Sequence, residues 1–531
     1  MLSREIKVIS GYTVIVGVIF ASVINWQTPQ NYDNGIRIWL LTQQWAVLLS
    51  NITVIELAPP LWHIFGKFGI TLSPLSPILT LRIMNLLLFL IMIPTGYYAG
   101  RMLGSQKAGW GTALILPWST YLISFITRTD HYILYASLAV IYTAILASLI
   151  SNHTRTKSLL FALTTAAFAF THYYALTYIA GTVFAAVALK VRVHGWQKVM
   201  QTTYNDAQQR RFGLYGWFKS PSVVPLASHL FPSCFLYLLW MPRFYKQIIH
   251  YHERFSSAYS SLTELVITAI LFIGRQLPTF APIDEIRFSL GIGIVVVFTV
   301  PIGFIGLVNS FRNPNQVRTT IIGGAFIGAG ILLMTGRFYS PRHGLWMAAI
   351  APIILGLGME VIATKAWKSP IILDRYSAIQ VIGIILIISI SAVPALATIN
   401  ETTEIETDVN RAADVVQNSY TANSVILSSH PKGEMILRAY GVEAPIHGVP
   451  EDSIKEEKAV RVRGDYHPDT HPNDFRRIQR LTEGKNRVIL FDARGTTEQL
   501  LSPLKRDLKT LGYKLVEEYR EGANGVIIFE R

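Results

Sequence analysis

The chain has 531 residues, of which 51% are hydrophobic and only 15% are charged, and its mean hydropathy is +0.36. Soluble domains carry about 25% charged residues, so this composition argues against a purely soluble globule, a disordered chain or a fibrous repeat. The charge is also uneven: residues 1–400 hold 28 Lys/Arg and 11 Asp/Glu, whereas residues 401–531 hold 19 and 22. We therefore predict a membrane domain over 1–400 and a small charged domain over 401–531.

The excess of basic residues belongs to the membrane part. A nucleic-acid partner is therefore not predicted, because such binding needs Lys and Arg clustered on a soluble face. The single cysteine, Cys234, excludes an intramolecular disulfide and a multi-cysteine zinc site. At the N-terminus, two basic residues precede an apolar run over 8–24 that lacks a clean cleavage site. This pattern predicts a retained signal anchor.

Apolar runs predict about eleven membrane-spanning helices, since a span needs roughly 20 apolar residues. An additional apolar stretch, 262–276, is short and is followed by Pro278, and the distribution of basic loops decides how it is counted. Because cytoplasmic loops carry an excess of Lys and Arg, the N-terminus and the basic loop 190–222 are predicted to be cytoplasmic. The later Lys/Arg-containing loops are then also cytoplasmic only if 262–276 does not span. The C-terminal domain then lies outside. The predicted spans are 7–25, 78–100, 108–126, 132–150, 158–172, 174–190, 223–241, 288–308, 320–335, 344–362 and 376–398.

The sequence predicts a small α/β domain over 401–531. Short apolar runs with polar flanks predict strands at 424–428 and 487–492, and a closing pair of strands at 514–518 and 525–530. Helical spacing of apolar residues predicts a helix over 497–511, which Gly512 ends. The stretch 448–478 is rich in charge, Pro and His and is predicted to be a loop.

Acidic residues are scarce in the membrane part, so each can be assessed separately as a candidate catalytic residue. Asp33, Glu56 and Asp130 are predicted to lie at the outer mouths of spans, the first two in a long first outer loop over 26–77. That loop is rich in Trp and Phe, which is typical of segments lying in the membrane interface. A partly desolvated carboxylate there could serve as a general base. Asp33 could equally be the N-cap of a helix over Gly35–Leu49.

Cations and histidines also gather at the predicted outer face. Arg82 and Arg128 lie at span ends, where ionisable residues are costly and by default mark a functional site. Arginine binds phosphate through a bidentate fork. For Arg128, a surface ion pair with Asp130 is an alternative. His131 and His172 lie near outer span ends without the helical spacing of metal ligands, so interfacial polar roles are the simpler interpretation.

Several short stretches resemble the GT-C superfamily of membrane glycosyltransferases. The nearest members are protein mannosyltransferases that use dolichyl-phosphate mannose and the lipid-linked aminosugar transferases. An acidic residue follows the first span, and an acidic residue precedes a Pro-Pro-Leu turn that leads into a loop helix. Arg opens the second span, Arg precedes Tyr at the third span's exit, a Thr-His-Tyr turn follows, and an Arg-aromatic-Tyr…Pro-Arg element opens a late span. These stretches are 32–34, 56–61, 81–83, 128–132, 171–173 and 337–342.

The resemblance covers roughly 1–400 and implies an inverting glycosyltransferase of the mannosyl or other hexosyl type, with its site at the extracytoplasmic membrane face. The donor would be a polyprenyl-phosphate-linked sugar, and the acceptor a hydroxyl of a protein, lipid or glycan. Asp33 would be the general base, and Glu56 would position the sugar or acceptor. Asp130 would assist the base or bind a divalent cation, and no other cofactor is implied. The residues implied to bind the substrate or its lipid phosphate also include Arg82, Arg128, His131, His172, Arg337, Tyr339 and Arg342.

A transporter or lipid flippase is the alternative function, and a non-catalytic scaffold is a third. Transporters often show matching halves with Gly- or Pro-broken spans. The sequence has no such halves, and its intramembrane charges are predicted to cluster at one face instead of the midplane. These features favour the enzyme.

Overall fold

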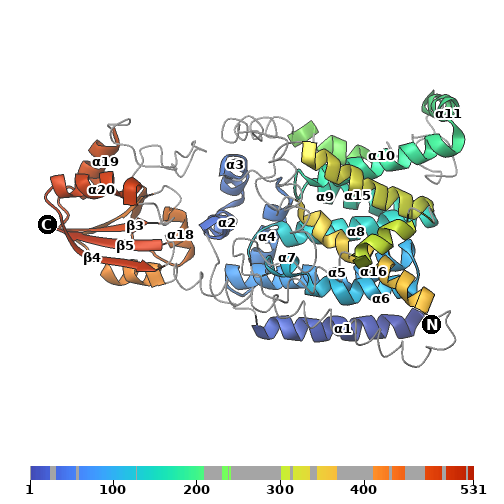
Figure 1. The fold of residues 1–531 in the computed structure, drawn as a ribbon. Helices are drawn as coiled ribbons and strands as arrows, with labels where there is room; N and C mark the ends of the chain where they lie inside the picture. Colours follow the sequence, from blue (N-terminus) through green and yellow to red (C-terminus); the bar gives the residue numbers. More distant parts are fainter. Residues whose placement is uncertain are drawn as a thin grey trace.

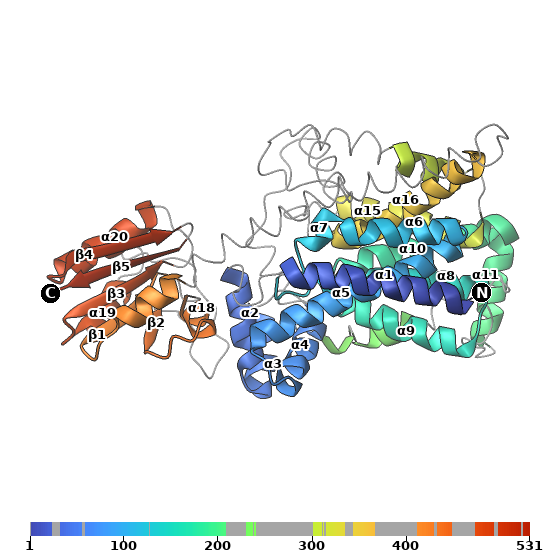
Figure 2. The ribbon, with the colours of Figure 1, turned by 90° about the horizontal axis from the view of Figure 1, so that it is seen from below.

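A computed structural model shows a bundle of helices and a separate β-sheet, with the sheet beyond the end of the bundle that is opposite the N-terminus (Figures 1 and 2). The helices α2, α3 and α4 lie between the bundle and the sheet. The structure describes residues 2–23, 32–55, 59–126, 128–208, 230–236, 238–240, 301–310, 312, 315–334, 344–366, 411–429, 433–448, 473–492, 498–521 and 524–531.

Within this described part, five helices are long and apolar enough to cross a membrane. They are α1 (Leu2–Val23), α5 (Pro77–Leu103), α8 (Tyr132–Ser151), α10 (Ala175–His194) and α16 (Leu345–Ala366). They coincide with predicted spans. The helices α9 (Arg155–Ala169) and α15 (Gln316–Met334) also fall on predicted spans. The stretch 262–276 and the predicted span 376–398 lie outside the described residues, so the total of eleven stays a prediction.

One predicted span is wrong in its detail. The stretch 108–126 is not a continuous helix but is divided into α6 (Gln106–Ile115), a 3-10 turn η1 (Leu116–Trp118) and the short α7 (Thr120–Ile123). Pro117 has no N–H to continue the helical hydrogen bonds, and the backbone becomes extended at Ser119, with φ −68° and ψ 102°. The apolar pattern could not reveal this break, because apolar residues occur in all three pieces and on both sides of Pro117.

The segment predicted as the first outer loop contains three helices, α2 (Tyr32–Thr42), α3 (Trp45–Ile55) and α4 (Leu61–Leu72). The predicted single helix over 35–49, with Asp33 as its N-cap, is therefore wrong. The helix begins at Tyr32, which places Asp33 inside its first turn. It ends where the side chains of Thr42 and Gln43 both donate to the carbonyl oxygen of Trp39, at 2.7 and 3.1 Å.

Four described residues that are predicted to be cytoplasmic, Arg4, Arg101, Arg155 and Arg192, lie at ends of α1, α5, α9 and α10. These helix ends lie at the end of the bundle that holds the N-terminus (Figure 1). There the carboxylate of Glu5 accepts hydrogen bonds from Arg101 at 2.6 Å, from Gln106 at 2.8 Å and from the Tyr97 hydroxyl at 2.9 Å. On a neighbouring pair of helices, Arg318 pairs with Glu360 at 3.7 Å. The sheet lies at the opposite end of the bundle.

The sheet has the strand order β2-β1-β3-β5-β4. β1 (Ser424–Ser428) pairs in parallel with β2 (Ile446–Gly448) and β3 (Arg487–Asp492), and β5 (Asn524–Glu530) runs antiparallel to both β3 and β4 (Lys514–Glu521). Apolar clusters cover both faces of the sheet. The helices of this part include α18 (Gly433–Ala439), α19 (Asn473–Thr482) and α20 (Glu498–Thr510).

The predicted strands 424–428, 487–492, 514–518 and 525–530 and the predicted helix 497–511 are confirmed as β1, β3, β4, β5 and α20. Part of the predicted loop 448–478 is wrong, because α19 begins at Asn473. The helix α19 is strongly charged and buries only a narrow apolar stripe that includes Ile478. Neither α18 nor the three-residue β2 is predicted by the sequence pattern.

Two long helices, α10 and α15, pack against each other through glycines. A Cβ added to Gly324 would lie 2.6 Å from the Cα of Thr182, and one added to Gly181 would lie 2.1 Å from the Gly324 carbonyl oxygen. Small residues of this kind let helix backbones approach closely inside membranes. The contact therefore requires glycine for reasons of space, not of backbone conformation.

This contact predicts a difference between two glycines of the same helix. Gly324→Ala should lower the free energy of unfolding by about 1–3 kcal/mol, the usual cost of overpacking. Gly330→Ala should be neutral or slightly stabilising, because a Cβ at Gly330 meets nothing within 4 Å and alanine favours helix. Thermal unfolding of the purified variants in detergent measures both effects. Equal melting temperatures for the two variants would contradict the packing.

Candidate active site

The end of the bundle that faces the sheet contains buried polar side chains from several connections. They come from α2, from the start of α5, from the α7–α8 connection and from the turn between α9 and α10. Ionisable groups buried at the end of a span are costly and indicate function. The described residues that form this polar layer are Arg37, Arg82, Asn85, Asp130, His131 and His172.

An ion pair lies at the centre of this layer. Arg37 of α2 is 6% exposed and Asp130 is 2% exposed, and Arg37 Nη1 lies 3.8 Å from Asp130 Oδ2. The other carboxylate oxygen, Oδ1, accepts the backbone N–H of Tyr132 at 3.2 Å, at the first residue of α8. The positive end of the α8 dipole therefore adds to the stabilisation that Arg37 gives the Asp130 carboxylate.

The α7–α8 connection is held to α5 as well. The side-chain amide of Asn85 donates to the carbonyl oxygen of Arg128, and the Arg128 guanidinium lies over the ring of Phe125, 4.6 Å from its centre. Arg82, one turn before Asn85 on α5, is fully buried. Two arginines that the sequence singled out therefore lie on neighbouring elements, α5 and the connection that α5 holds in place.

The two predicted histidines meet in an aromatic group. The rings of His131 and His172 are 5.2 Å apart, and Tyr135 stacks on His172 at 4.7 Å. His172 Nδ1 accepts the backbone N–H of Tyr174 at 3.2 Å. With Nδ1 as the acceptor, a neutral His172 carries its proton on Nε2.

Further contacts place the turn between α9 and α10 beside the first outer loop. The backbone N–H of Leu61, at the start of α4, donates to the carbonyl oxygen of Phe170 at 3.2 Å. Trp240 Nε1 donates to the Tyr173 hydroxyl at 3.1 Å. Burial raises the pKa of the Tyr173 hydroxyl to about 12, and the hydrogen bond from Trp240 opposes that rise. Tyr173 is therefore a neutral hydroxyl at any physiological pH.

The structure brings together Asp130, His131 and His172, and places Arg82 and Arg128 on adjoining elements. Asp33 lies on the same helix as Arg37, in its first turn. Glu56, Arg337, Tyr339 and Arg342 lie outside the described residues, so their predicted places in the site stay predictions. In the described part of the chain, no group of three His, Cys, Asp or Glu side chains is close enough to hold a metal ion.

Sequence reasoning did not assign Arg37, Asn85 or the fully buried His63 to the site. Helical spacing carries a signal for two of them. Arg37 is four residues after Asp33, and Asn85 is three residues after Arg82, and residues at these spacings share a helix face. No such signal exists for His63, which follows an apolar residue on the mainly apolar helix α4.

The sheet part contacts the helix that carries Arg37. α18 packs against α2 (Figures 1 and 2). At that contact Ala439 joins an apolar cluster formed by Ile38, Leu41, Trp62, Leu81 and Leu134. α2 is therefore held between α18 on one side and the polar layer of the bundle on the other.

No protein-family model matches the chain, and no curated protein matches it by sequence. Its backbone is nevertheless similar to solved structures over nearly its whole length. ArnT from Cupriavidus metallidurans, solved bound to undecaprenyl phosphate, has a TM-score of 0.58 at 14% identity, and the match covers 99% of this chain and 98% of ArnT.

The oligosaccharyltransferase AglB from Archaeoglobus fulgidus, solved with an inhibitory peptide and a dolichol-phosphate, has a TM-score of 0.52 at 12% identity. That match covers 98% of this chain and 74% of AglB. The mycobacterial arabinofuranosyltransferase AftD has a TM-score of 0.51 at 13% identity, with 99% of this chain and 41% of AftD covered.

These neighbours are all membrane glycosyltransferases of one fold. The chain has the GT-C fold. The fold that the short motifs led us to expect is thus confirmed. The sequence identities to these neighbours are only 12–14%. Neighbours of this fold are integral membrane proteins, and five described helices of this chain are long and apolar enough to cross a membrane. The polar layer lies at the end of the bundle nearest α18 and the sheet.

The Arg37–Asp130 pair predicts strong coupling between two substitutions. Removing one partner of a buried ion pair strands the other charge and costs about 3–5 kcal/mol. Arg37→Met and Asp130→Asn should each lower the free energy of unfolding by that order, and the double variant should lose much less than their sum. Denaturant unfolding in detergent gives this coupling energy.

The pair between Arg101 and Glu5 at the opposite end of the bundle is a matched control. The Arg101 side chain is 37% exposed, so its coupling to Glu5 should be about 1 kcal/mol or less. Additive effects of Arg37→Met and Asp130→Asn would show that the two side chains do not interact.

The contact of α18 with α2 predicts a local effect of one substitution. Ala439→Glu places a charge in an apolar contact, which is unfavourable without a partner, and should loosen α2. Hydrogen exchange read by mass spectrometry should then show faster exchange in peptides that cover 32–42, with β1 and β3 unchanged. Ala422→Glu, at an exposed turn before β1, is the control. Unchanged exchange in α2 would contradict the contact.

Proposed function

We propose that the chain is an inverting glycosyltransferase that moves a sugar from a polyprenyl-phosphate donor to an acceptor hydroxyl at the extracytoplasmic membrane face. The observation that carries this proposal is the buried layer of charged and aromatic residues around Arg37 and Asp130, in a chain with the GT-C fold. Neighbours of this fold were solved with undecaprenyl phosphate and with dolichol-phosphate.

The proposed reaction is a single displacement at the anomeric carbon of the sugar. Asp33 removes the proton from the acceptor hydroxyl, and the acceptor oxygen forms the new bond to the anomeric carbon. The bond from that carbon to the phosphate oxygen breaks, and the polyprenyl phosphate leaves with the bonding electrons. Configuration inverts because the acceptor attacks from the face opposite the phosphate.

The arginines supply what the leaving group needs. Negative charge grows on the phosphate as the bond breaks, and fixed cations in a water-poor setting stabilise it strongly. We propose that Arg82 and Arg128, which lie on adjoining elements, supply these cations together with Arg337 and Arg342. His172, with a proton on Nε2, can donate to the same phosphate. Glu56 and Tyr339 are proposed to orient the sugar.

Arg37 and Asp130 are proposed to have a positioning role. Their ion pair fixes α2 against the α7–α8 connection, and α2 carries Asp33 in its first turn. The base is thereby held at a defined distance from Arg128, which is two residues before Asp130. Asp130 is already engaged by Arg37 and by a backbone N–H, which favours the assisting role over binding a divalent cation.

The distribution of charge between the two ends of the bundle supports an orientation in the membrane. Basic residues gather at the end that holds the N-terminus, and cytoplasmic loops carry an excess of Lys and Arg. We therefore propose that this end is cytoplasmic and that the sheet, 424–530, lies outside. The transporter alternative is not favoured, because the described buried ion pair and its histidines lie at one end of the bundle, whereas transporter sites lie near the midplane.

The base role predicts a selective loss of activity. General acid–base catalysis contributes about 10²- to 10⁴-fold, so Asp33→Asn should lower the rate of sugar transfer by at least 100-fold without lowering the amount of folded protein. Transfer of radiolabelled sugar from a panel of polyprenyl-phosphate donors, in proteoliposomes, measures this rate. Asp206→Asn, in α11 (Trp196–Gln208) at the opposite end, should keep full activity. Full activity in Asp33→Asn would rule out the base role.

A further inference from the structure

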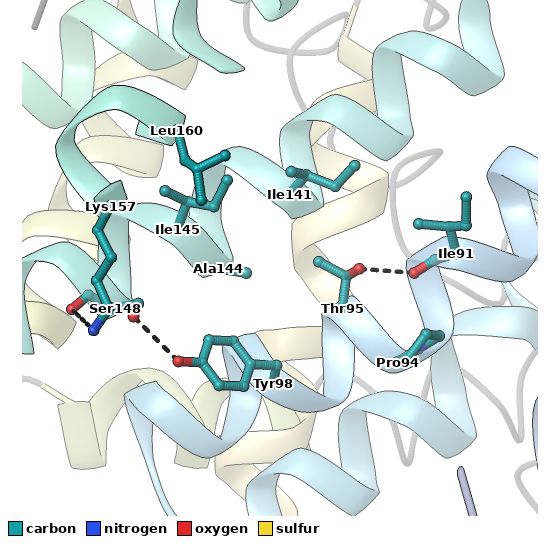
Figure 3. A pocket seen from close by; sticks show the side chains of 10 residues that line it. All are labelled: Ile91, Pro94, Thr95, Tyr98, Ile141, Ala144, Ile145, Ser148, Lys157 and Leu160. Atoms are coloured by element: carbon teal, nitrogen blue, oxygen red, sulfur yellow. Dashed lines mark hydrogen bonds between the residues drawn. The ribbon is translucent and has the colours of Figure 1, made fainter. Parts of the chain in front are cut away.

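A groove lies on the surface of the bundle between α5, α8 and α9 (Figure 3). Its volume is about 580 Å³, within the range of pockets that hold small molecules. α5 contributes Ile91, Pro94, Thr95 and Tyr98, α8 contributes Ile141, Ala144, Ile145 and Ser148, and α9 contributes Lys157 and Leu160.

The groove is a site distinct from the polar layer. Ser148 is 17 residues after His131 along α8, which at 1.5 Å per residue separates them by about 25 Å. The α8–α9 turn lies at the end of the bundle that holds the N-terminus and its basic residues (Figure 1). The groove therefore opens at the opposite membrane face from the proposed transferase site.

The two ends of the groove differ in chemistry. One end and most of the wall are hydrocarbon, formed by isoleucine, leucine, alanine and proline side chains. At the other end, the Lys157 ammonium donates to the carbonyl oxygens of Asn152 at 2.9 Å and Ser148 at 3.4 Å, and the Tyr98 hydroxyl donates to Ser148 Oγ at 3.1 Å (Figure 3). An ammonium has three donors, so Lys157 keeps one for a ligand.

The position of the groove in the fold decides what can fill it. Ile91 is 47% exposed and Leu160 is 47% exposed, and the neighbouring Leu159 and Leu163 are exposed as well. On spanning helices of a GT-C fold, such side chains face the hydrocarbon of the bilayer. The surface is indented at the small side chains of Ala144 and Pro94 (Figure 3). A lipid chain reaches it directly from the bilayer.

We propose that this groove binds one anionic phospholipid of the bilayer, with an acyl chain along the isoleucines and its phosphate at Lys157. Charge complementarity selects the headgroup. Lys157 is the charged side chain among those that line the groove, and Arg155 lies two residues before it at the start of α9. A cation near the membrane surface is worth about 1 kcal/mol toward anionic lipid. This site does not depend on the proposed catalytic role of Asp33.

The test is native mass spectrometry of the full-length protein titrated with phosphatidylglycerol or with phosphatidylcholine of the same chains. The wild type should bind the first lipid (phosphatidylglycerol) about fivefold more tightly than the second. Lys157→Gln should remove that preference, and Lys157→Arg should keep it. Lys198→Gln, an exposed lysine of α11 at the same end, should also keep it and controls for loss of charge alone.

A second pair of variants tests the chain-binding part of the groove. Leu160→Trp should fill it and weaken binding of both lipids several-fold. Leu163→Trp, on the same helix and 55% exposed but outside the lining, should not. Equal wild-type affinity for the two lipids, an unchanged preference in Lys157→Gln, or identical binding in the two tryptophan variants would each overturn the proposal. Sugar transfer measured in parallel separates failure of this site from failure of the transferase assignment.

Discussion

The burial of two opposite charges, Arg37 and Asp130, is the constraint on which the sheet-facing end of this molecule depends. A charge taken out of water costs several kcal/mol unless a partner is close, so α2 must lie against the α7–α8 connection for either residue to be tolerated. That requirement fixes an element of the first outer loop onto the bundle. It also fixes Asp33 in the first turn of the same helix, and α18 then packs on α2.

The two ends of the bundle handle charge in different ways. At the end with the N-terminus, Arg101, Glu5 and Lys157 remain partly exposed and are satisfied by one another or by helix carbonyls. At the other end, Arg37, Arg82 and Asp130 are almost completely buried. Low exposure makes an electrostatic interaction stronger and an unpaired charge more costly. The contrast supports our two proposals, group-transfer chemistry at the buried end and a peripheral lipid site at the other.

Much of this architecture could be predicted from the sequence, and the misses have physical causes. Long apolar runs define α5, α8, α10 and α16, and short apolar runs with polar flanks define β1, β3 and β5. The division of 108–126 at Pro117 was missed because the run stays apolar through the break. Asp130 was singled out because acids are scarce, but its partner Arg37 was not, since nearly 100 residues separate them. Only the fold brings α2 to the α7–α8 connection, and α19 was missed because its charged sequence resembles a loop.

Photochemical labelling with a polyprenyl phosphate that carries a photoreactive group next to the phosphate tests the central claim most directly. After irradiation in membranes and digestion, labelled peptides should cover the start of α5 near Arg82, the connection 128–131 and the turn 171–174. Unmodified polyprenyl phosphate should compete for this labelling, and phosphatidylglycerol should not. Labelling confined to the N-terminal end of the bundle, or labelling that polyprenyl phosphate does not reduce, would contradict the assignment of the polar layer as the donor site.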